Sequence, residues 1–426
     1  MNEQKSSLSP LALQLLDTTD EQLSTLELGA RQGLIELDTV VLPETPLGDN
    51  NHLGFAEATS SGDTLILIHR RMTGHNPWGA GKADKYSSFT MTTTSADGGK
   101  TWTESFNIRD AMDTKFRDRG GLIPLSHRYK YGPLNHSKEG YKLHLNGLGT
   151  SRAGTVVILC NYGAFRSEDK GRTWEHFPEQ FREDTTKGDI VYVGPRIVDH
   201  PDIGLCAFGN TTGYGRSEKF PNPVDGPIEN TRSDFVFLSS KDDGRTWEKT
   251  IHPLPSWAAQ YEPAALIHKN DIFILARDEL ALTSHLQIRV SEGIPVDVRR
   301  ASMRQSNKVE DIGFDYNPVT KRFEAVRSVR EKMLLDIWSI DPEDWDSAEW
   351  RFEGTIFARK SEDLEFYDTA DGFHPTGTVI DEKKGVQHIF IYSGHPCGPA
   401  GSFRITRTLD TPRLSNFLVE HMQSSS

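Results

Sequence analysis

Short apolar runs, some of them alternating with polar residues, recur along most of the chain. Residues 34–42, 64–71 and 155–161 are examples, each rich in Val, Ile, Leu or Thr and followed by turn-forming residues. Runs of this kind are typical of β-strands. Leucines at helix-like spacing occur in residues 8–30, where we expect one or two short helices. The pattern predicts an all-β domain with a short helical N-terminal extension.

One octapeptide occurs three times, as Ser-x-Asp-x-Gly-x-Thr-Trp. The copies are 95–102, 167–174 and 240–247, so their starts lie 72 (167 − 95) and 73 (240 − 167) residues apart. Repetition at a nearly fixed period indicates one supersecondary unit used several times. The Asp side chain can accept backbone N–H groups, and Gly supplies the positive φ of a tight turn. Each copy therefore predicts a structural hairpin turn, with Trp as an apolar anchor between neighbouring sheets.

These copies resemble the Asp-box (BNR) repeat of the sialidase superfamily. The resemblance implies a six-bladed β-propeller, or a seven-bladed one if residues 330–360 hold further strands. A strand at 34–42 would pair with one near 402–408 and leave no open sheet edge. Blade three would begin with one strand over 189–198. In the family, the boxes lie on the rim, away from the active site.

We expect three segments: an N-terminal extension (1–33), a single propeller domain (34–415) and a C-terminal tail (416–426). The formal net charge of −13 argues against duplex nucleic acid or an anionic membrane as a partner. The start of the chain holds no long apolar run, so no signal peptide or membrane span is expected. A cytoplasmic location is the default, or a secreted one if a leader has been removed.

Cysteine usage predicts neither a disulfide framework nor a metal centre. Cys160, Cys206 and Cys397 are odd in number and far apart. His374, His395 and Cys397 are metal ligands by type, but their spacing matches no compact zinc motif. We expect no cofactor, and the sequence leaves a structural metal open.

In a propeller, the starts of the first strands and the ends of the second strands point into a common pocket. A basic pocket there suits a carboxylated sugar, because Arg grips a carboxylate with two parallel hydrogen bonds. The candidates that fall at such positions are His52, His69, Arg70, Arg71, His144, Arg196, Tyr261, Glu262, Arg277, Asp278, Phe373, His374 and His395.

The resemblance to sialidases extends to some of these positions. That family holds its substrate carboxylate with three arginines and uses an acid/base Asp, a Tyr nucleophile and a Glu that activates the Tyr. Glu262 and Arg277 match the family's spacing, and Arg327 or Arg330 falls where the third arginine is expected. Glu262 and Arg277 could also be a structural ion pair.

Three other positions depart from the family. His52 stands where the first arginine is expected, and His75 where the acid/base Asp is expected. The last blade opens with Phe373 and His374 instead of the nucleophilic Tyr. A retaining sialidase mechanism is therefore not expected unless Tyr367 or Tyr392 substitutes.

The His pair resembles that of propeller lyases that act on uronic-acid polysaccharides. A lyase must neutralise the uronate carboxylate, remove the C5 proton and protonate the leaving oxygen. Histidine suits the last two roles because its pKa lies near working pH. On this hypothesis His52 and His75 are base and acid, in an order left open. Arg71 and Arg277 hold the carboxylate, and Tyr261 assists proton transfer.

The sequence thus leaves three functions open. We place β-elimination first, hydrolysis with Glu262 as the single carboxylate second, and a non-catalytic carbohydrate-binding propeller third. The expected partner is an acidic oligo- or polysaccharide. The identity of the sugar, exo or endo action and the oligomeric state stay open.

Overall fold

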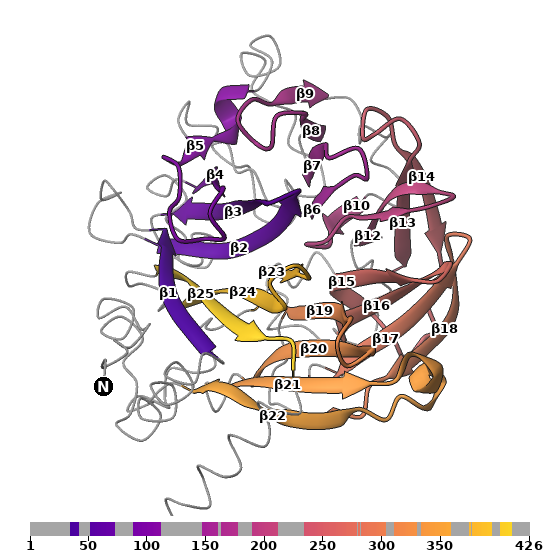
Figure 1. Ribbon diagram of the computed structural model, residues 1–426. Helices are drawn as coiled ribbons and strands as arrows, with labels where there is room; N and C mark the ends of the chain where they lie inside the picture. The colour runs from indigo at the N-terminus through magenta and orange to yellow at the C-terminus, as the bar shows by residue number, and fades with distance from the viewer. Residues whose placement is uncertain are drawn as a thin grey trace, which may run out of the picture.

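Six antiparallel sheets are arranged in a ring in the computed structural model, and each is one blade of the propeller (Figure 1). Five blades have four strands, and blade three has five because its innermost strand is interrupted. This confirms the predicted all-β fold and its six-bladed form. The structure describes residues 35–41, 52–72, 88–111, 147–160, 163–177, 190–211, 234–278, 280–281, 283–303, 311–329, 334–358, 375, 377–393 and 401–410. The predicted N-terminal helices and the C-terminal tail lie outside these residues. No helix in the described part is long and apolar enough to cross a membrane.

The first three blades follow the chain in order. Blade one holds β2 (His52–Ser61), β3 (Thr64–Met72), β4 (Ser88–Ser95) and β5 (Phe106–Asn107), followed by the 3-10 helix η2 (Ile108–Ala111). Blade two holds β6 (Gly147–Thr150), β7 (Val156–Cys160), β8 (Gly163–Ser167) and β9 (Glu175–Phe177). Blade three holds β10 (Ile190–Val193), β11 (Val198–His200), β12 (Gly204–Thr211), β13 (Phe235–Ser240) and β14 (Glu248–His252).

The other three blades complete the ring. Blade four holds β15 (Gln260–His268), β16 (Asp271–Asp278), β17 (His285–Ser291) and β18 (Ile294–Arg300). Blade five holds β19 (Ile312–Asn317), β20 (Arg322–Val329), β21 (Leu334–Ile340) and β22 (Arg351–Ala358), with the 3-10 helix η5 (Pro342–Ser347) before β22. Blade six holds β23 (Gly377–Asp381), β24 (Val386–Ser393), β25 (Gly401–Thr408) and β1 (Ile35–Val41).

The two ends of the domain close the ring in blade six. β1 pairs antiparallel with β25, from Ile35 opposite Arg407 to Val41 opposite Ser402. The predicted pairing of the first and last strands is thereby confirmed. The predicted single strand over 189–198 is wrong, because β10 and β11 both pair with β12 but are separated by residues 194–197. This segment instead bonds to blade two, through a parallel bridge between Leu148 and Arg196.

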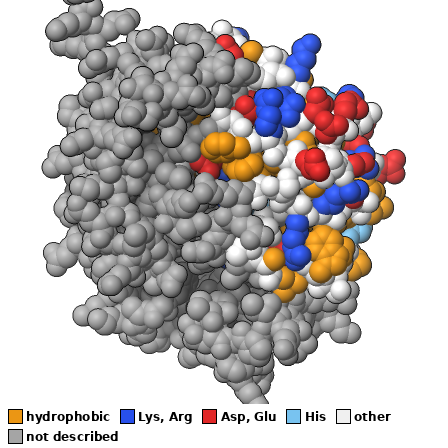
Figure 2. Space-filling view, turned by 90° about the horizontal axis from the view of Figure 1, so that it is seen from below, with side chains coloured by type: hydrophobic (Ala, Val, Ile, Leu, Met, Phe, Trp, Pro, Cys, Tyr) orange, Lys and Arg blue, Asp and Glu red, His pale blue; other side chains and the backbone are white. Residues whose placement is uncertain are grey.

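The hydrophobic core lies between adjacent blades. Ile66 and Ile68 of blade one pack with Ile158 and Phe165 of blade two, for example. The tryptophans of the three octapeptides join such clusters, and Trp102 meets Phe390 of blade six edge-on at 5.9 Å. The prediction that these tryptophans anchor neighbouring sheets is confirmed. Figure 2 shows acidic and basic side chains interspersed with small hydrophobic groups on the part of the surface that is described.

The three octapeptides form the same turn, each between the third and fourth strands of its blade. In each, the Ser hydroxyl donates to the Asp carboxylate at 2.8–2.9 Å and accepts the Gly N–H at 2.7–2.8 Å. The Thr hydroxyl donates to the second carboxylate oxygen at 2.6 Å. The Gly residues have φ of 85–86°. The predicted turn geometry is confirmed.

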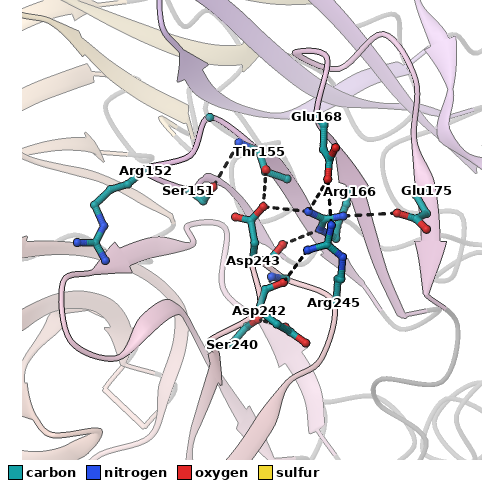
Figure 3. Close-up of polar contacts among 12 residues, drawn as sticks. Ser151, Arg152, Thr155, Arg166, Glu168, Glu175, Ser240, Asp242, Asp243 and Arg245 are labelled. Carbon is teal, nitrogen blue, oxygen red and sulfur yellow. Dashed lines mark hydrogen bonds and ion pairs between the residues drawn. The ribbon is translucent and has the colours of Figure 1, made fainter.

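A buried arginine fastens the third of these turns to blade two (Figure 3). The side chain of Arg166, on β8, is 1% exposed. Its Nε donates to the Asp243 carbonyl at 2.6 Å and its Nη2 donates to the Asp243 carboxylate at 2.9 Å. Arg404 of β25 likewise donates to the carbonyl of Gly98 at 2.5 Å. Asp243 and Gly98 both occupy the fourth position of their turns. In both inter-blade contacts, an arginine of one blade therefore donates to the carbonyl of the same turn position in the next blade.

Removal of Arg166 is expected to destabilise the ring. Arg166→Ala removes the buried guanidinium that donates to both the Asp243 carbonyl and the Asp243 carboxylate, and we expect a loss of about 2–3 kcal/mol in the free energy of unfolding. Chemical denaturation measures it. The control is Arg245→Ala in the same cluster, whose exposed pair with Glu168 is worth less than about 1 kcal/mol. Equal losses in the two variants would contradict a special role for Arg166.

The turn aspartates predict acid sensitivity. Burial acts to raise the pKa of Asp242, but hydrogen bonds from Thr246 and Ser240 outweigh it and hold the pKa below 3.8. A lowered folded-state pKa stabilises the fold above the unfolded value, and this stabilisation is lost as pH falls through the folded value. Unfolding free energy should therefore decline below about pH 4.

In Asp242→Asn the ionised acceptor is gone. We expect about 1 kcal/mol lower stability at pH 7, after allowance for solvent screening of this partly exposed group, and a shallower decline on acidification. Denaturant titrations at several pH values provide the measurement. An unchanged pH profile would count against the turn as the acid-sensitive element.

Candidate functional site

Blade four brings three of the predicted pocket residues together at one end of the sheet. Tyr261 and Glu262 lie at the start of β15, and Arg277 lies next to the end of β16. Tyr261 stands directly opposite Arg277 in the register. Because strands alternate in direction, this end of the blade is opposite to the end that carries the octapeptide turns of the other blades. The site and the turns therefore occupy different faces of the ring.

Glu262 has an unusual backbone conformation. Its φ is 53°, and the register of β15 against β16 shifts between Tyr261 and Ala264. Among the described residues, it is the one non-glycine with positive φ that lies inside a strand, since the others lie in turns or after η5. This conformation costs a non-glycine residue about 1–2 kcal/mol. Bulges and strained backbone of this kind gather at functional sites, where they re-aim a side chain.

The side chains of the three residues form one cluster. Nη1 of Arg277 donates to Oε2 of Glu262 at 3.1 Å, and the two side chains are 14% and 12% exposed. The guanidinium carbon of Arg277 lies 5.2 Å from the centroid of the Tyr261 ring. The ion pair that the sequence left as an alternative is thus present. A carboxylate, a guanidinium and a phenol in contact can orient an anionic ligand and accept a proton from it or from water.

Arg196 crosses the centre of the ring. It belongs to blade three, and its Nη1 donates to the Phe314 carbonyl at 2.5 Å and to Asp315 at 2.7 Å, both in blade five. Its Nη2 donates to the Thr378 carbonyl and hydroxyl in blade six at 2.6 and 2.7 Å. Blades three and six are opposite each other in a six-membered ring. Arg196 was predicted as a pocket residue. It spans the axis, and its guanidinium forms these hydrogen bonds with other blades of the protein.

Asp315, on blade five, accepts hydrogen bonds from Arg196 and from Gln387 of blade six. Burial acts to raise the pKa of Asp315, but the Arg196 guanidinium and hydrogen bonds from Thr378 and Gln387 outweigh it and lower the pKa below its usual value. Gln387 also accepts from Arg407, which is paired with buried Glu324. Sequence reasoning missed this chain of contacts. Its one sequence signal is an acidic residue inside the apolar run 312–316.

Of the remaining predicted residues, the strand register places two, His52 and Arg71, at the same end of blade one. Arg327 is 1% exposed, and its guanidinium carbon lies 5.9 Å from the Trp338 ring centroid. His52 begins β2 and Arg71 lies in β3, but nothing is described of their side chains. His75, His144, Arg330, His374, Tyr367, His395 and Cys397 lie outside the described residues. The described residues contain no group of three or more His, Cys, Asp or Glu that could hold a metal.

No family model matches the chain, and no curated protein matches it. Solved structures do match. A protein of unknown function from Dyadobacter fermentans has 15% identity and a TM-score of 0.57, and the match covers 87% of this chain and 99% of that one. A Hadza microbial sialidase has 13% identity and a TM-score of 0.54, covering 84% of this chain and 66% of that one.

A sialidase of Trypanosoma rangeli, solved with 2,3-difluorosialic acid, has 10% identity and a TM-score of 0.54. The match covers 87% of this chain and 56% of that one, so this chain spans just over half the length of the trypanosomal protein. At such identities the likeness shows the fold: the chain has the six-bladed propeller architecture of sialidase-type proteins.

The contacts of Arg196 predict a large effect of its removal. Arg196→Met leaves the buried Asp315 carboxylate without its cation, so we expect a loss of about 3–5 kcal/mol in unfolding free energy. Denaturant titration measures the loss. Lys383→Ala is the control, because the exposed Lys383–Asp63 pair also joins two blades but is worth at most about 1 kcal/mol. A loss as small as that of the control would mean that Arg196 does not secure the ring.

Proposed function

We propose that the chain is a carbohydrate-active enzyme that cleaves a glycosidic bond next to a carboxylated sugar. The observation that carries the proposal is the cluster of Glu262, Arg277 and Tyr261, with Glu262 held in a costly backbone conformation at the pocket end of β15. The basic candidates at the same ends of other blades suit an anionic sugar. The sialidase-type fold and the three octapeptide turns, which we assign as Asp-box repeats, support the same reading.

Within this class we place hydrolysis first. The hydrogen bond from Arg277 orients the carboxylate of Glu262. Glu262 is then suited to accept a proton from water or from Tyr261, or to stabilise positive charge that develops on the sugar. Arg277 would hold both this carboxylate and the carboxylate of the substrate.

Elimination is the second candidate, and the position of His52 favours it. His52 is the first residue of β2, as Gln260 is of β15, so it lies at the end of blade one that corresponds to the Tyr261 and Glu262 end of blade four. Arg71 stands opposite Leu53 in the register and so lies at the same end of blade one. With His75, these residues would supply the proton transfers and the charge neutralisation that β-elimination from a uronate requires.

The test compares Glu262→Gln and His52→Ala on a panel of sialosides and uronate polysaccharides. Hydrolysis gives new reducing ends without the ultraviolet absorbance of an unsaturated uronate, and we expect Glu262→Gln to lower its rate by about 100-fold or more. Glu292→Gln is the matched control: it is a positive-φ glutamate of the same blade, in the turn at the opposite end. It should leave the rate unchanged.

Three other outcomes of this test would each contradict hydrolysis by Glu262. Rising ultraviolet absorbance, abolished by His52→Ala, would move elimination to first place. Binding of the panel without turnover would favour a carbohydrate-binding module and contradict an enzyme. Full activity in Glu262→Gln would remove Glu262 from the chemistry.

A further inference from the structure

A second cluster on blade four has no role in the chemistry described above. Trp257 lies in the connection before β15 and is 41% exposed. The guanidinium carbon of Arg300, the last residue of β18, lies 5.1 Å from the Trp257 ring centroid. Its Nη2 donates to the Trp257 carbonyl at 2.8 Å, and its side chain is 43% exposed. An indole ring and a guanidinium are thus stacked at the surface.

A buried carboxylate fixes this cluster in place. Asp278 is fully buried and accepts from Nε of Arg300 at 2.9 Å. Its other oxygen accepts the N–H groups of Leu280 at 3.0 Å and Ala259 at 3.4 Å. One side chain therefore ties together the segment before β15, the segment after β16 and the end of β18. The stacked pair is a preorganised surface.

The cluster lies at the same end of blade four as Tyr261, Glu262 and Arg277, but its side chains point to the other face of the sheet. Asp278 directly follows Arg277 in β16. Neighbouring residues of a strand point to opposite faces of the sheet. The Arg300–Asp278 pair and the Arg277–Glu262 pair thus leave β16 in opposite directions and form two separate clusters.

The cluster has the chemistry to bind a charged sugar. An arginine carries five N–H donors, and two of those of Arg300 are used, one each by Asp278 and Trp257. The other three have no partner among the described residues and can reach a carboxylate. The indole offers a flat apolar surface for the C–H face of a sugar ring. Because Asp278 balances the charge of Arg300, the expected affinity is modest.

We propose that Trp257 and Arg300 form a second subsite for a carboxylated sugar unit. The substrate is then a charged oligosaccharide or polysaccharide that occupies the Glu262 cluster with one unit and this surface with another. This inference rests on the proposed function and narrows its substrate class to oligomers that carry more than one carboxylate.

Direct binding tests the subsite without reference to turnover. The probes are oligomeric sialic acid and oligogalacturonate, with a neutral malto-oligosaccharide for comparison, titrated by calorimetry into the full chain. We expect Trp257→Ala to bind a charged oligomer about tenfold more weakly, the effect of losing one stacked ring, and Trp257→Phe to retain part of the affinity. Phe352→Ala, another exposed aromatic, on blade five, is the control and should bind as the wild type does.

A second pair of variants tests the cation. Arg300→Gln should weaken binding of the charged oligomer, whereas Arg299→Gln should not. Arg299 is the preceding residue of β18, so its side chain points to the face of the sheet opposite to that of Arg300. Thermal unfolding verifies that Arg300→Gln remains folded. If it does not fold, the Trp257 variants decide alone.

The failures of the two proposals are distinguishable. Full turnover in Glu262→Gln overturns the role of Glu262 but leaves the binding result standing. The subsite is overturned by equal affinity of Trp257→Ala and the wild type, by an equal loss for the neutral oligomer, or by no wild-type binding of either charged oligomer. Cleavage of a single-unit sialoside or uronide should be unchanged in Trp257→Ala, and a matching loss there would also overturn it.

Discussion

One guanidinium joins three blades across the axis of the ring. Blades of a propeller pack against their neighbours, so contacts across the centre are few, and Arg196 supplies such a contact between blade three and blades five and six. The backbone next to it is equally constrained, because a Cβ on Gly194 would lie 2.4 Å from Cγ of Pro263. Pro263 directly follows Glu262. The segment that carries Arg196 is therefore packed against the strand that presents the candidate carboxylate.

One face of the ring holds the structural octapeptide turns, and the opposite face holds the candidate site residues. On one face, each octapeptide turn fixes its own geometry, and Arg166 and Arg404 fasten two of the turns to the preceding blade. On the other face, the strand ends present Tyr261, Glu262 and Arg277. A stable turn face allows the opposite face to hold a strained residue, since the 1–2 kcal/mol cost of Glu262 is small beside the inter-blade contacts.

The sequence predicted the features whose cause is local or periodic. The turns follow from fixed residue types at fixed offsets, and the closing strand follows from its apolar pattern and from the need to leave no edge. The spacing of Glu262 and Arg277 identified a pair that is in contact. The break between β10 and β11 was missed because residues 194–197 bond to blade two, which no local pattern encodes. Arg196 was predicted at the central pocket, but its hydrogen-bond partners were missed, since they lie 118 to 182 residues away.

The end of β16 connects the two side-chain clusters of blade four. Arg277 and Asp278 are consecutive, and the first pairs with Glu262 while the second holds Arg300 against Trp257. Strand geometry fixes the directions in which their side chains leave, so the two clusters lie on opposite faces of the same strand end. A chain of charged sugars bound at the Trp257 surface would be held at a set position relative to Glu262. Binding energy gained there would orient the bond to be cleaved, which is how contacts remote from the reacting atoms contribute to rate.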